Sequence, residues 1–352
     1  MILRRALGAA LAVFLVAACS DAGAPADSPG LRVLGEVTSG LTAPWGLAFL
    51  PDGSALVSQR DDGKVLRIDA RGVRTDVGVV PDVDHVGEGG LLGLAVAADF
   101  ATHPYLYAYE TTKTDNRIVR MKYSADGLGT PTVLLSGLAK AEFHNGGRIA
   151  FGPDGKLYAG VGDATETGHS QDRTSLNGKI LRLNPDGSVP ADNPFPGSRV
   201  WSYGHRNVQG LAWDPAGNLF ASEFGQKAWD ELNLIKPGSD YGWPKVEGFG
   251  GTRQGFTDPL RAWHTDVASP SGVAWLDGSV WMAALKGGRL WEIPMDGTTP
   301  GKPRAWFTGK YGRLRTVAVA PDGRTLWLMT NNTDGRGVVK NGDDKILRVA
   351  LR

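Results

Sequence analysis

The stretch GLAFLPDGSALVSQ (residues 46–59) contains two short apolar runs joined by Pro-Asp-Gly, and this phrase recurs along the chain. Alternating apolar and polar residues are typical of half-buried strands, and Asp-Gly supplies the positive φ that a tight turn requires. The phrase therefore predicts a β-hairpin. Further copies are RIAFGPDGKLYAGVG from Arg148, GLAWDPAGNLFASE from Gly210, TVAVAPDGRTLWLMT from Thr316 and a weaker GVAWLDGSVWMAAL from Gly272.

A third apolar segment often follows the hairpin, as in GKVLRID (63–69), GKILRLN (178–184), GRLWEIP (288–294) and DKILRVA (344–350). The copies recur about every fifty residues, within the range of propeller blades. Together with the similar stretch GLLGLAV…YLYAYE (90–110), they predict an all-β fold, a six-bladed β-propeller over residues 31–352.

Two further features support this interpretation. The segment RVLGEV (32–37) is expected to pair with the last strands, near residues 346–349, and so to close the ring and remove an exposed sheet edge. A two-domain α/β fold would need helical periodicity between the strands, and no sustained i, i+3, i+4 stripe follows residue 30.

Residues 1–18 have the pattern of an export signal, with a basic start at Arg4 and Arg5 followed by an apolar run too short to span a membrane comfortably. The single cysteine, Cys19, follows Val-Ala-Ala as in a bacterial lipobox, which predicts a lipidated first residue of a mature envelope lipoprotein. Ordinary secretory cleavage that leaves a spare thiol is the alternative. Residues 19–30 are small, polar and Pro/Gly-rich, which predicts a flexible tether.

Composition narrows the function classes. Without Arg4 and Arg5 the chain keeps 36 of its 38 basic residues against 37 acidic ones, so it lacks the basic excess that a nucleic-acid partner would require. A single cysteine cannot form an internal disulfide. The domain must therefore be held together by burial of apolar surface.

Three segments depart from the blade consensus in ways that packing does not require. In the first, His144 precedes Asn-Gly-Gly and an inner strand, at the blade edge facing the central channel. Histidine titrates near neutral pH, so His144 is a candidate proton acceptor, with Asp163 of VGDA as the carboxylate that fixes its tautomer. The alternative is a loop histidine with a purely structural role.

The second segment is YGHRNVQG (203–210), in which Arg206 and Asn207 precede an apolar strand. Arg206 is a candidate for clamping a carboxylate or a developing oxyanion, and Asn207 for donating to a ring or quinone oxygen. Adjacent side chains in a strand point to opposite sides, so a structural turn role is expected for His205.

The third segment is a dispersed basic set comprising Lys286 in AALKGG and Arg313 with Arg315 in GRLRT. Arg313 and Arg315 are two residues apart, so both would project to one face and repel each other unless an anion lies between them. Singly, each would be a solvated surface charge. Together, three cations entering strands at equivalent blade positions predict a polyanionic ligand.

These residues lie in phrases that resemble the glucose/sorbosone dehydrogenase family, and within it the periplasmic aldose sugar dehydrogenases more than the soluble glucose dehydrogenases. The phrases keep the family's order along nearly the whole chain after the leader. They are EGGLLGLAVAADF (88–100), HNGGRIAFGPDGKLYAGVGDA (144–164), NGKILRLNPDGSVPADNPF (177–195), YGHRNVQGLAWDP (203–215), DELNLI (230–235), DYGWP (240–244), ALKGGRLWEI (284–293) and GRLRTVAVAPDG (312–323).

The resemblance implies oxidation of an aldose at its anomeric carbon to a lactone, with hydride transfer to pyrroloquinoline quinone (PQQ). In this family pattern His144 is the general base, Asp163 orients it, and Arg206 stabilises negative charge on the reduced quinone. PQQ is a planar tricarboxylate, which explains a convergence of basic residues. The cofactor-binding residues implied are Asn207, Lys286, Arg313 and Arg315.

The resemblance also implies Ca²⁺ bound by backbone oxygens of Gly225 and Gln226 as a Lewis acid. Here the chain departs from the family, because Phe224 and Gln226 replace the usual His and Pro, and loss of the proline predicts a looser loop. Glu88 stands where glucose-specific members carry glutamine, so the sugar contacts are expected to differ. The long insertions of the glucose dehydrogenases are absent, which implies a more open pocket.

Two function classes follow from the sequence. The first is an exported quinoprotein oxidoreductase acting on a small aldose, with an unidentified electron acceptor and membrane contact only through the lipid anchor. The second is a non-catalytic exported propeller that binds a glycan or a protein partner. The first is favoured because the candidate base and the cationic residues all occur in the chain.

Overall fold

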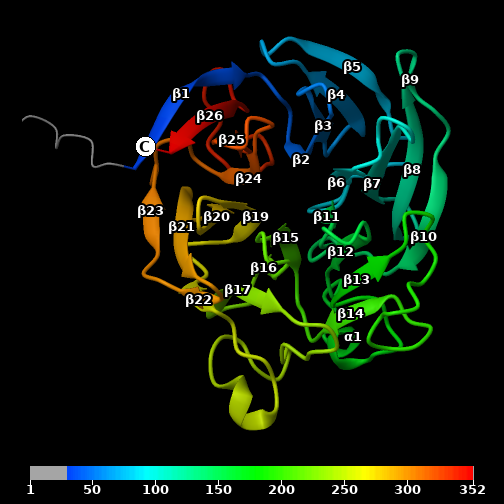
Figure 1. Cartoon of the computed structure of the whole chain (residues 1–352), viewed down its shortest axis with the longest axis vertical. Helices are drawn as coiled ribbons and strands as arrows, with labels where there is room; N and C mark the ends of the chain where they lie inside the picture. The colour runs from blue at the N-terminus through cyan, green and yellow to red at the C-terminus, as the bar shows by residue number, and fades with distance from the viewer. Residues whose placement is uncertain (1–29, 352) are drawn as a thin grey trace, which may run out of the picture.

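The computed structural model describes residues 30–351, which form six antiparallel sheets arranged in a ring around a central axis (Figure 1). This confirms the predicted six-bladed β-propeller. The predicted export signal (1–18), Cys19 and most of the predicted tether lie outside the described residues. No helix among residues 30–351 has the length and apolar character needed to cross a membrane.

Within each blade the strands follow one another from the axis outward. The first blade contains β2 (Pro44–Phe49), β3 (Ala55–Gln59), β4 (Lys64–Ile68) and β5 (Arg74–Val79). The second contains β6 (Leu91–Val96), β7 (Tyr105–Thr111), β8 (Asn116–Ser124) and β10 (Thr132–Leu138), with β9 (Gly127–Leu128) paired to β8. The third contains β11 (Ile149–Phe151), β12 (Leu157–Val161), β13 (Lys179–Leu183) and β14 (Val200–Tyr203).

The second half of the ring repeats this order, and two short helices lie in loops of the third and fourth blades. The fourth blade contains β15 (Val208–Trp213), β16 (Leu219–Glu223), β17 (Trp229–Ile235) and β18 (Arg261–His264). The fifth contains β19 (Pro270–Leu276), β20 (Ser279–Ala284), β21 (Arg289–Asp296), β22 (Thr299–Pro300) and β23 (Arg304–Trp306). The sixth contains β24 (Leu314–Val319), β25 (Thr325–Thr330), β26 (Ile346–Leu351) and β1 (Leu31–Thr38). The helices are α1 (Gly168–Gln171) and the 3₁₀ helix η1 (Gly251–Gln254).

The ring is closed by the strand predicted for this purpose. β1 pairs antiparallel with β26, with Leu31 opposite Leu351, Val33 opposite Val349 and Thr38 opposite Ile346. The first strand of the chain thus forms the outer strand of the last blade (Figure 1). This pairing covers the edge of β26, which would otherwise be open to another chain.

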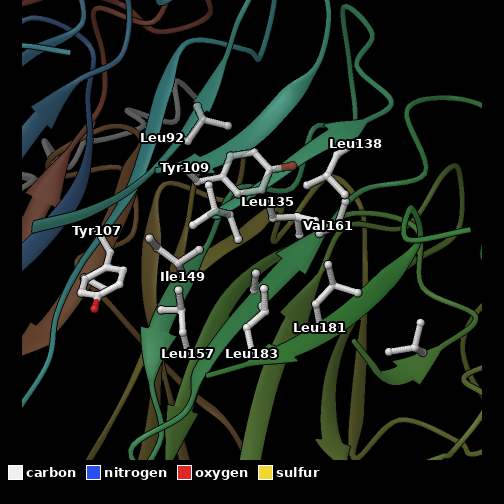
Figure 2. Packing of buried hydrophobic residues seen from close by; sticks show 14 of the residues in the cluster. Leu92, Tyr107, Tyr109, Leu135, Leu138, Ile149, Leu157, Val161, Leu181 and Leu183 are labelled. Carbon is white, nitrogen blue, oxygen red and sulfur yellow. The ribbon is translucent and has the colours of Figure 1, made fainter. Parts of the chain in front are cut away.

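The core consists of apolar layers between neighbouring sheets. Figure 2 shows one such layer, in which Leu92 and Tyr109 of the second blade lie near Ile149, Leu157 and Leu181 of the third. These side chains are almost completely buried. Each fully buried large apolar side chain contributes about 1.5–3 kcal/mol relative to exposure, so such layers stabilise the ring without a disulfide.

Close approach of neighbouring inner strands explains a recurrent glycine in the hairpin phrase. A Cβ on Gly46 of β2 would lie 2.6 Å from the carbonyl oxygen of Leu92 in the next blade. A Cβ on Gly210 of β15 would overlap the carbonyl oxygen of Ser271 in the same way. The glycines therefore allow the blades to meet around the axis.

We expect Gly210→Ala to lower the free energy of unfolding by about 1–3 kcal/mol, because the added methyl group meets backbone that cannot rotate away. Gly35→Ala is the matched control, since a Cβ at Gly35 meets no atom within 4 Å. It should change stability by less than about 0.5 kcal/mol. Urea unfolding of both variants measures the difference, and equal stabilities would contradict the packing explanation.

The strand order places the loops on two faces. The predicted Pro-Asp-Gly turns connect the first and second strands, and Gly53, Gly155 and Gly323 adopt positive φ of 82°, 71° and 64° there. Loops that enter each inner strand, and loops between the second and third strands, lie at the opposite end because the strands run antiparallel. This second set of loops carries every predicted catalytic, cofactor, sugar and metal residue, apart from Arg315 at the start of β24.

Candidate active site

Four predicted site residues come together at this loop-bearing face. His144 lies in the loop before β11, Asp163 directly after β12, Arg206 in the loop before β15 and Glu88 in the loop before β6. They belong to three different blades, and each is linked to another by a hydrogen bond described below. The face thus carries a connected polar network next to the propeller axis.

The imidazole of His144 is held by a buried carboxylate. His144 Nδ1 lies 2.8 Å from Asp163 Oδ1, and the side chain of Asp163 is completely buried. The other oxygen of Asp163 accepts a hydrogen bond from Trp243 Nε1 at 2.9 Å. Burial alone would raise the pKa of Asp163, but the interactions with His144 and Trp243 hold it below its ordinary value. Asp163 is therefore ionised and accepts the Nδ1 proton of His144.

The second imidazole nitrogen faces Arg206. Arg206 Nη2 lies 2.7 Å from His144 Nε2, and Nη1 donates to the carbonyl of Phe224 at 3.1 Å. The guanidinium also lies 5.5 Å from the centroid of the Trp243 ring, and its Nε is buried without a partner among the described residues. Since an arginine can only donate, the lone pair of His144 must be on Nε2. His144 is thus poised to accept a proton at Nε2.

The carboxylate of Glu88 holds the loop that carries His144 through a hydrogen bond, and it also forms an ion pair. Its Oε2 accepts the backbone amide of His144 at 3.0 Å, and its Oε1 pairs with Arg336 Nη1 at 2.9 Å. Burial would raise the pKa of Glu88, but the His144 amide and the Arg336 charge hold it below its usual value. His144 itself has φ of +62°, a region that histidine enters more readily than most residues.

Asn207 also supports this loop. Its side chain is fully buried, and Oδ1 accepts a hydrogen bond from the amide of Gly146 at 3.0 Å. Its Nδ2 lies 3.4 Å from Glu88 Oε2. The amide group therefore fixes the backbone beside His144 and links it to Glu88.

Arg313 and Arg315 meet, but an internal carboxylate lies between them. Arg313 contacts Asp334 Oδ2 with Nε at 3.0 Å and Nη2 at 2.8 Å, and Arg315 Nη2 lies 3.7 Å from the same oxygen. Burial would raise the pKa of Asp334, whereas Arg313 and Arg315 hold it low. The repulsion expected from the sequence is thus relieved by Asp334, and does not by itself require a ligand.

Lys286 is placed differently from the two arginines. It lies in the loop between β20 and β21, whereas Arg313 lies before the inner strand β24 and Arg315 within it, so the prediction of equivalent blade positions was wrong. Its side chain is exposed and has no ion pair with any residue of 30–351. The loop around it is fixed by Leu285 and Gly287, whose amides donate to Ser269 and Ala268 at 3.0 Å each. Lys286 therefore presents an unpaired ammonium group on a rigid loop.

The loop at Gly225 and Gln226 is tightly held, in contrast to the looser loop expected from the missing proline. Glu247 Oε1 accepts four successive backbone amides, from Gln226 at 2.7 Å, Lys227 at 3.2 Å, Ala228 at 3.1 Å and Trp229 at 3.0 Å. Proline at 226 could not donate the first of these. Four hydrogen bonds to one carboxylate replace the rigidity that a proline would give.

Sequence reasoning missed several residues that support the network. Trp243 lies in the quoted phrase DYGWP, but its bond to Asp163 spans 80 positions along the chain. Glu247, Asp334 and Arg336 lie outside every phrase singled out in the sequence. The structural role expected for His205 agrees with the structure, because it is fully buried and bonds Ser202 and Glu223 at 2.8 Å each.

Comparison with known proteins finds relatives among the sugar dehydrogenases. The Glucose / Sorbosone dehydrogenase family profile matches residues 41–346. The solved PQQ-bound aldose sugar dehydrogenase of Streptomyces coelicolor is 57% identical with a TM-score of 0.89, over 94% of this chain and 100% of that one. Aldose sugar dehydrogenase YliI of Escherichia coli K12 is 30% identical over 331 residues, covering 84% of this chain and 89% of that protein.

Quinoprotein glucose dehydrogenase B of Acinetobacter calcoaceticus is 39% identical over 251 residues. That match covers 60% of this chain and 52% of the relative, so the chain spans about half the length of that protein. Because the family profile covers nearly all of the propeller, this chain belongs to the glucose/sorbosone dehydrogenase family.

Proposed function

We propose that this chain is a PQQ-dependent aldose dehydrogenase that oxidises the anomeric carbon of a sugar to a lactone. The observation that carries the proposal is the chain of contacts Asp163–His144–Arg206 on the loop-bearing face, which leaves a base lone pair at Nε2. Similarity to the PQQ-bound aldose sugar dehydrogenase of Streptomyces coelicolor supports the choice of cofactor and substrate class.

The residues present suit a planar tricarboxylate. Lys286 offers an ammonium group without an ion-pair partner in the described chain, and Arg206 has a buried Nε without a hydrogen bond. Arg313 and Arg315 are partly neutralised by Asp334, yet two cations share one carboxylate and leave excess positive charge. These groups, with Asn207, would hold the carboxylates and the quinone edge of PQQ.

The side chains divide the work of the reaction. His144 Nε2 takes the proton of the anomeric hydroxyl, which requires the sugar to displace Arg206 Nη2 from that lone pair. Asp163 holds the imidazole in the Nδ1–H tautomer and stabilises the imidazolium that forms. When bound, PQQ supplies the acceptor for the hydride leaving the anomeric carbon, and Ca²⁺ supplies Lewis-acid polarisation.

Calcium would be held by backbone carbonyls. Among residues 30–351 no group of three or more His, Cys, Asp or Glu side chains is placed to bind a metal ion. The amides of Gln226 and Lys227 point to Glu247, and C=O and N–H of a trans peptide point in opposite directions. The carbonyls of Gly225 and Gln226 therefore point away from Glu247 and accept no hydrogen bond from a described residue. Such free oxygens are the donors that Ca²⁺ prefers.

We expect Glu247→Ala to weaken calcium binding about tenfold, because the four amides lose their common acceptor and the carbonyls lose their fixed direction. Calorimetric titration of the cofactor-free protein with calcium measures this directly. Glu166→Ala is the control, since Glu166 is an exposed carboxylate in the loop between β12 and β13. A folded Glu247→Ala protein with unchanged calcium affinity would rule out this carbonyl site.

Reconstitution tests the proposed reaction. Purified protein with PQQ and calcium should reduce an artificial dye when glucose, other aldoses or sorbosone are added. Absence of turnover with every aldose, together with absence of PQQ binding, would favour the second function class, a propeller that binds a glycan or a protein. PQQ binding without turnover would mean that the protein binds the cofactor but that its substrate is not one of the sugars tested.

The leader gives a further proposal about location. The apolar run before Cys19 supports export and lipidation of this cysteine in the cell envelope. The mass of the amino-terminal peptide of the native protein tests it. A peptide that starts at Cys19 with attached acyl chains supports the lipoprotein, whereas an unmodified cysteine contradicts it.

A further inference from the structure

A cavity lies on the propeller axis, on the side of the Pro-Asp-Gly turns. It has a volume of about 380 Å³ and is lined by the inner strands of all six blades, β2, β6, β11, β15, β19 and β24, which surround the centre of the ring in Figure 1. Its lining belongs mainly to the ends of these strands that lead into the Pro-Asp-Gly turns, with aromatic side chains from Phe49, Phe151, Trp213 and Trp275.

Within the described part of the chain, Arg148 is the one charged residue that lines this cavity. Its Nε donates to the carbonyl of Gln209 at 2.8 Å, and Nη2 donates to Thr316 Oγ1 at 3.2 Å. Its guanidinium lies 4.3 Å from the centroid of the Trp45 ring. The third nitrogen, Nη1, has no hydrogen-bond partner among the described residues and is not sealed off by protein atoms.

No acidic group of residues 30–351 balances this charge. Arg148 is only 7% exposed, forms no ion pair with a residue of 30–351, and contacts only neutral groups. Burial lowers its pKa to about 9, so the guanidinium is charged at neutral pH. Buried arginines are almost always paired, because an isolated charge in a low-dielectric interior is costly. By contrast, the neighbouring buried Arg315 has Asp334 within 3.7 Å.

We propose that the axial cavity binds a small monovalent anion such as chloride against Arg148 Nη1. One cation balances one negative charge, and the otherwise uncharged lining selects an anion that gives up its hydration easily. A divalent sulfate or phosphate would need a second cation, and none lines the cavity. The site supplies the missing counter-charge at the centre of the ring.

This site is independent of the proposed dehydrogenase function. Lys286, Arg206 and Arg313 lie in loops of the opposite face, whereas the anion would lie among the inner strands. One proposed cofactor residue, Arg315 of β24, borders the anion site through Gln209, whose Oε1 accepts from Arg315 Nη1 and whose carbonyl accepts from Arg148 Nε, both at 2.8 Å. The anion site can therefore be tested on protein that has received neither PQQ nor calcium. Failure of aldose oxidation would leave it untouched, and its own failure would leave the dehydrogenase proposal standing.

Bromide provides a direct test, because it replaces chloride and scatters X-rays anomalously at its absorption edge. Crystals of the cofactor-free protein in sodium bromide should show an anomalous peak in hydrogen-bonding contact with Arg148 Nη1. Crystals in sodium gluconate contain no halide and should show no anomalous peak there. A bromide data set without a peak in the cavity would overturn the proposal. It would mean that water, and not an anion, contacts Arg148 Nη1.

A solution measurement adds a second readout. Replacing gluconate by chloride at equal ionic strength should raise the Tm of the wild-type protein by about 2 °C in a saturable manner. Arg148→Gln should lose this increment, whereas Arg120→Gln, which removes an arginine bonded to the Pro185 carbonyl outside the axis, should keep it. Equal chloride responses in all three proteins would contradict the proposal. If Arg148→Gln does not fold, the bromide map of the wild-type protein decides.

Discussion

Replacing His144 with alanine is expected to lower kcat for aldose oxidation about 100- to 10,000-fold, the usual contribution of a positioned general base. The reason is geometric. The lone pair on Nε2 is the one that can accept the substrate proton, because Nδ1 already donates its proton to Asp163 at 2.8 Å. PQQ affinity should remain close to wild type, since the cationic residues that would hold PQQ are untouched. Steady-state dye reduction and PQQ titration measure the two quantities separately.

A second variant separates lost chemistry from backbone strain. His144 has φ of +62°, which alanine tolerates poorly and asparagine tolerates well, so His144→Asn should show the same loss of kcat in a fully folded protein. His103→Ala is the control, because His103 is an exposed surface histidine paired with Asp99. Normal turnover by folded His144→Asn would show that another group takes the proton.

Lys286→Ala is expected to weaken PQQ binding about 10- to 100-fold, the cost of one charge-assisted hydrogen bond or ion pair of about 1.5–3 kcal/mol. Stability should be unchanged, because Lys286 has no ion pair among the described residues and its loop is held by backbone hydrogen bonds. This makes Lys286 a cleaner probe than Arg313, whose removal would leave the buried Asp334 with one fewer cation.

The matched control is Lys302→Ala, an exposed lysine in the turn between β22 and β23 at the opposite end of its blade. Both variants should unfold at the wild-type urea concentration, and only Lys286→Ala should need more PQQ for saturation. Equal PQQ affinities for the two variants would exclude Lys286 from the cofactor site.

The fold could be predicted well because its signals are local. The Pro-Asp-Gly hairpins, the alternating strands and the recurring third strand are each encoded within about fifty residues. The closing strand was also predictable, since the last blade has three strands of its own and the segment at 32–37 supplies the fourth, as β1 pairs with β26.

The site could be predicted only in part. Residue types and blade position pointed to His144, Asp163 and Arg206, and the structure joins all three through hydrogen bonds of 2.7–2.8 Å. The same reasoning treated Arg313 and Arg315 as free cations, although Asp334 lies between them. It also expected a loose loop at Gln226, although Glu247 holds it. In both cases the partner comes from a distant loop that no local pattern identifies.

The sequence by itself determined the six blades and the closing strand, because turn chemistry and strand alternation act between neighbours along the chain. Only the tertiary structure decided which charged side chains have an oppositely charged or hydrogen-bonding partner. Trp243 reaches Asp163 across 80 positions and Arg336 reaches Glu88 across 248, while Arg148 has no acidic partner in the part of the chain that the structure describes. These outcomes depend on how the closed ring brings distant loops together, since electrostatic pairing follows distance in space and not distance in sequence.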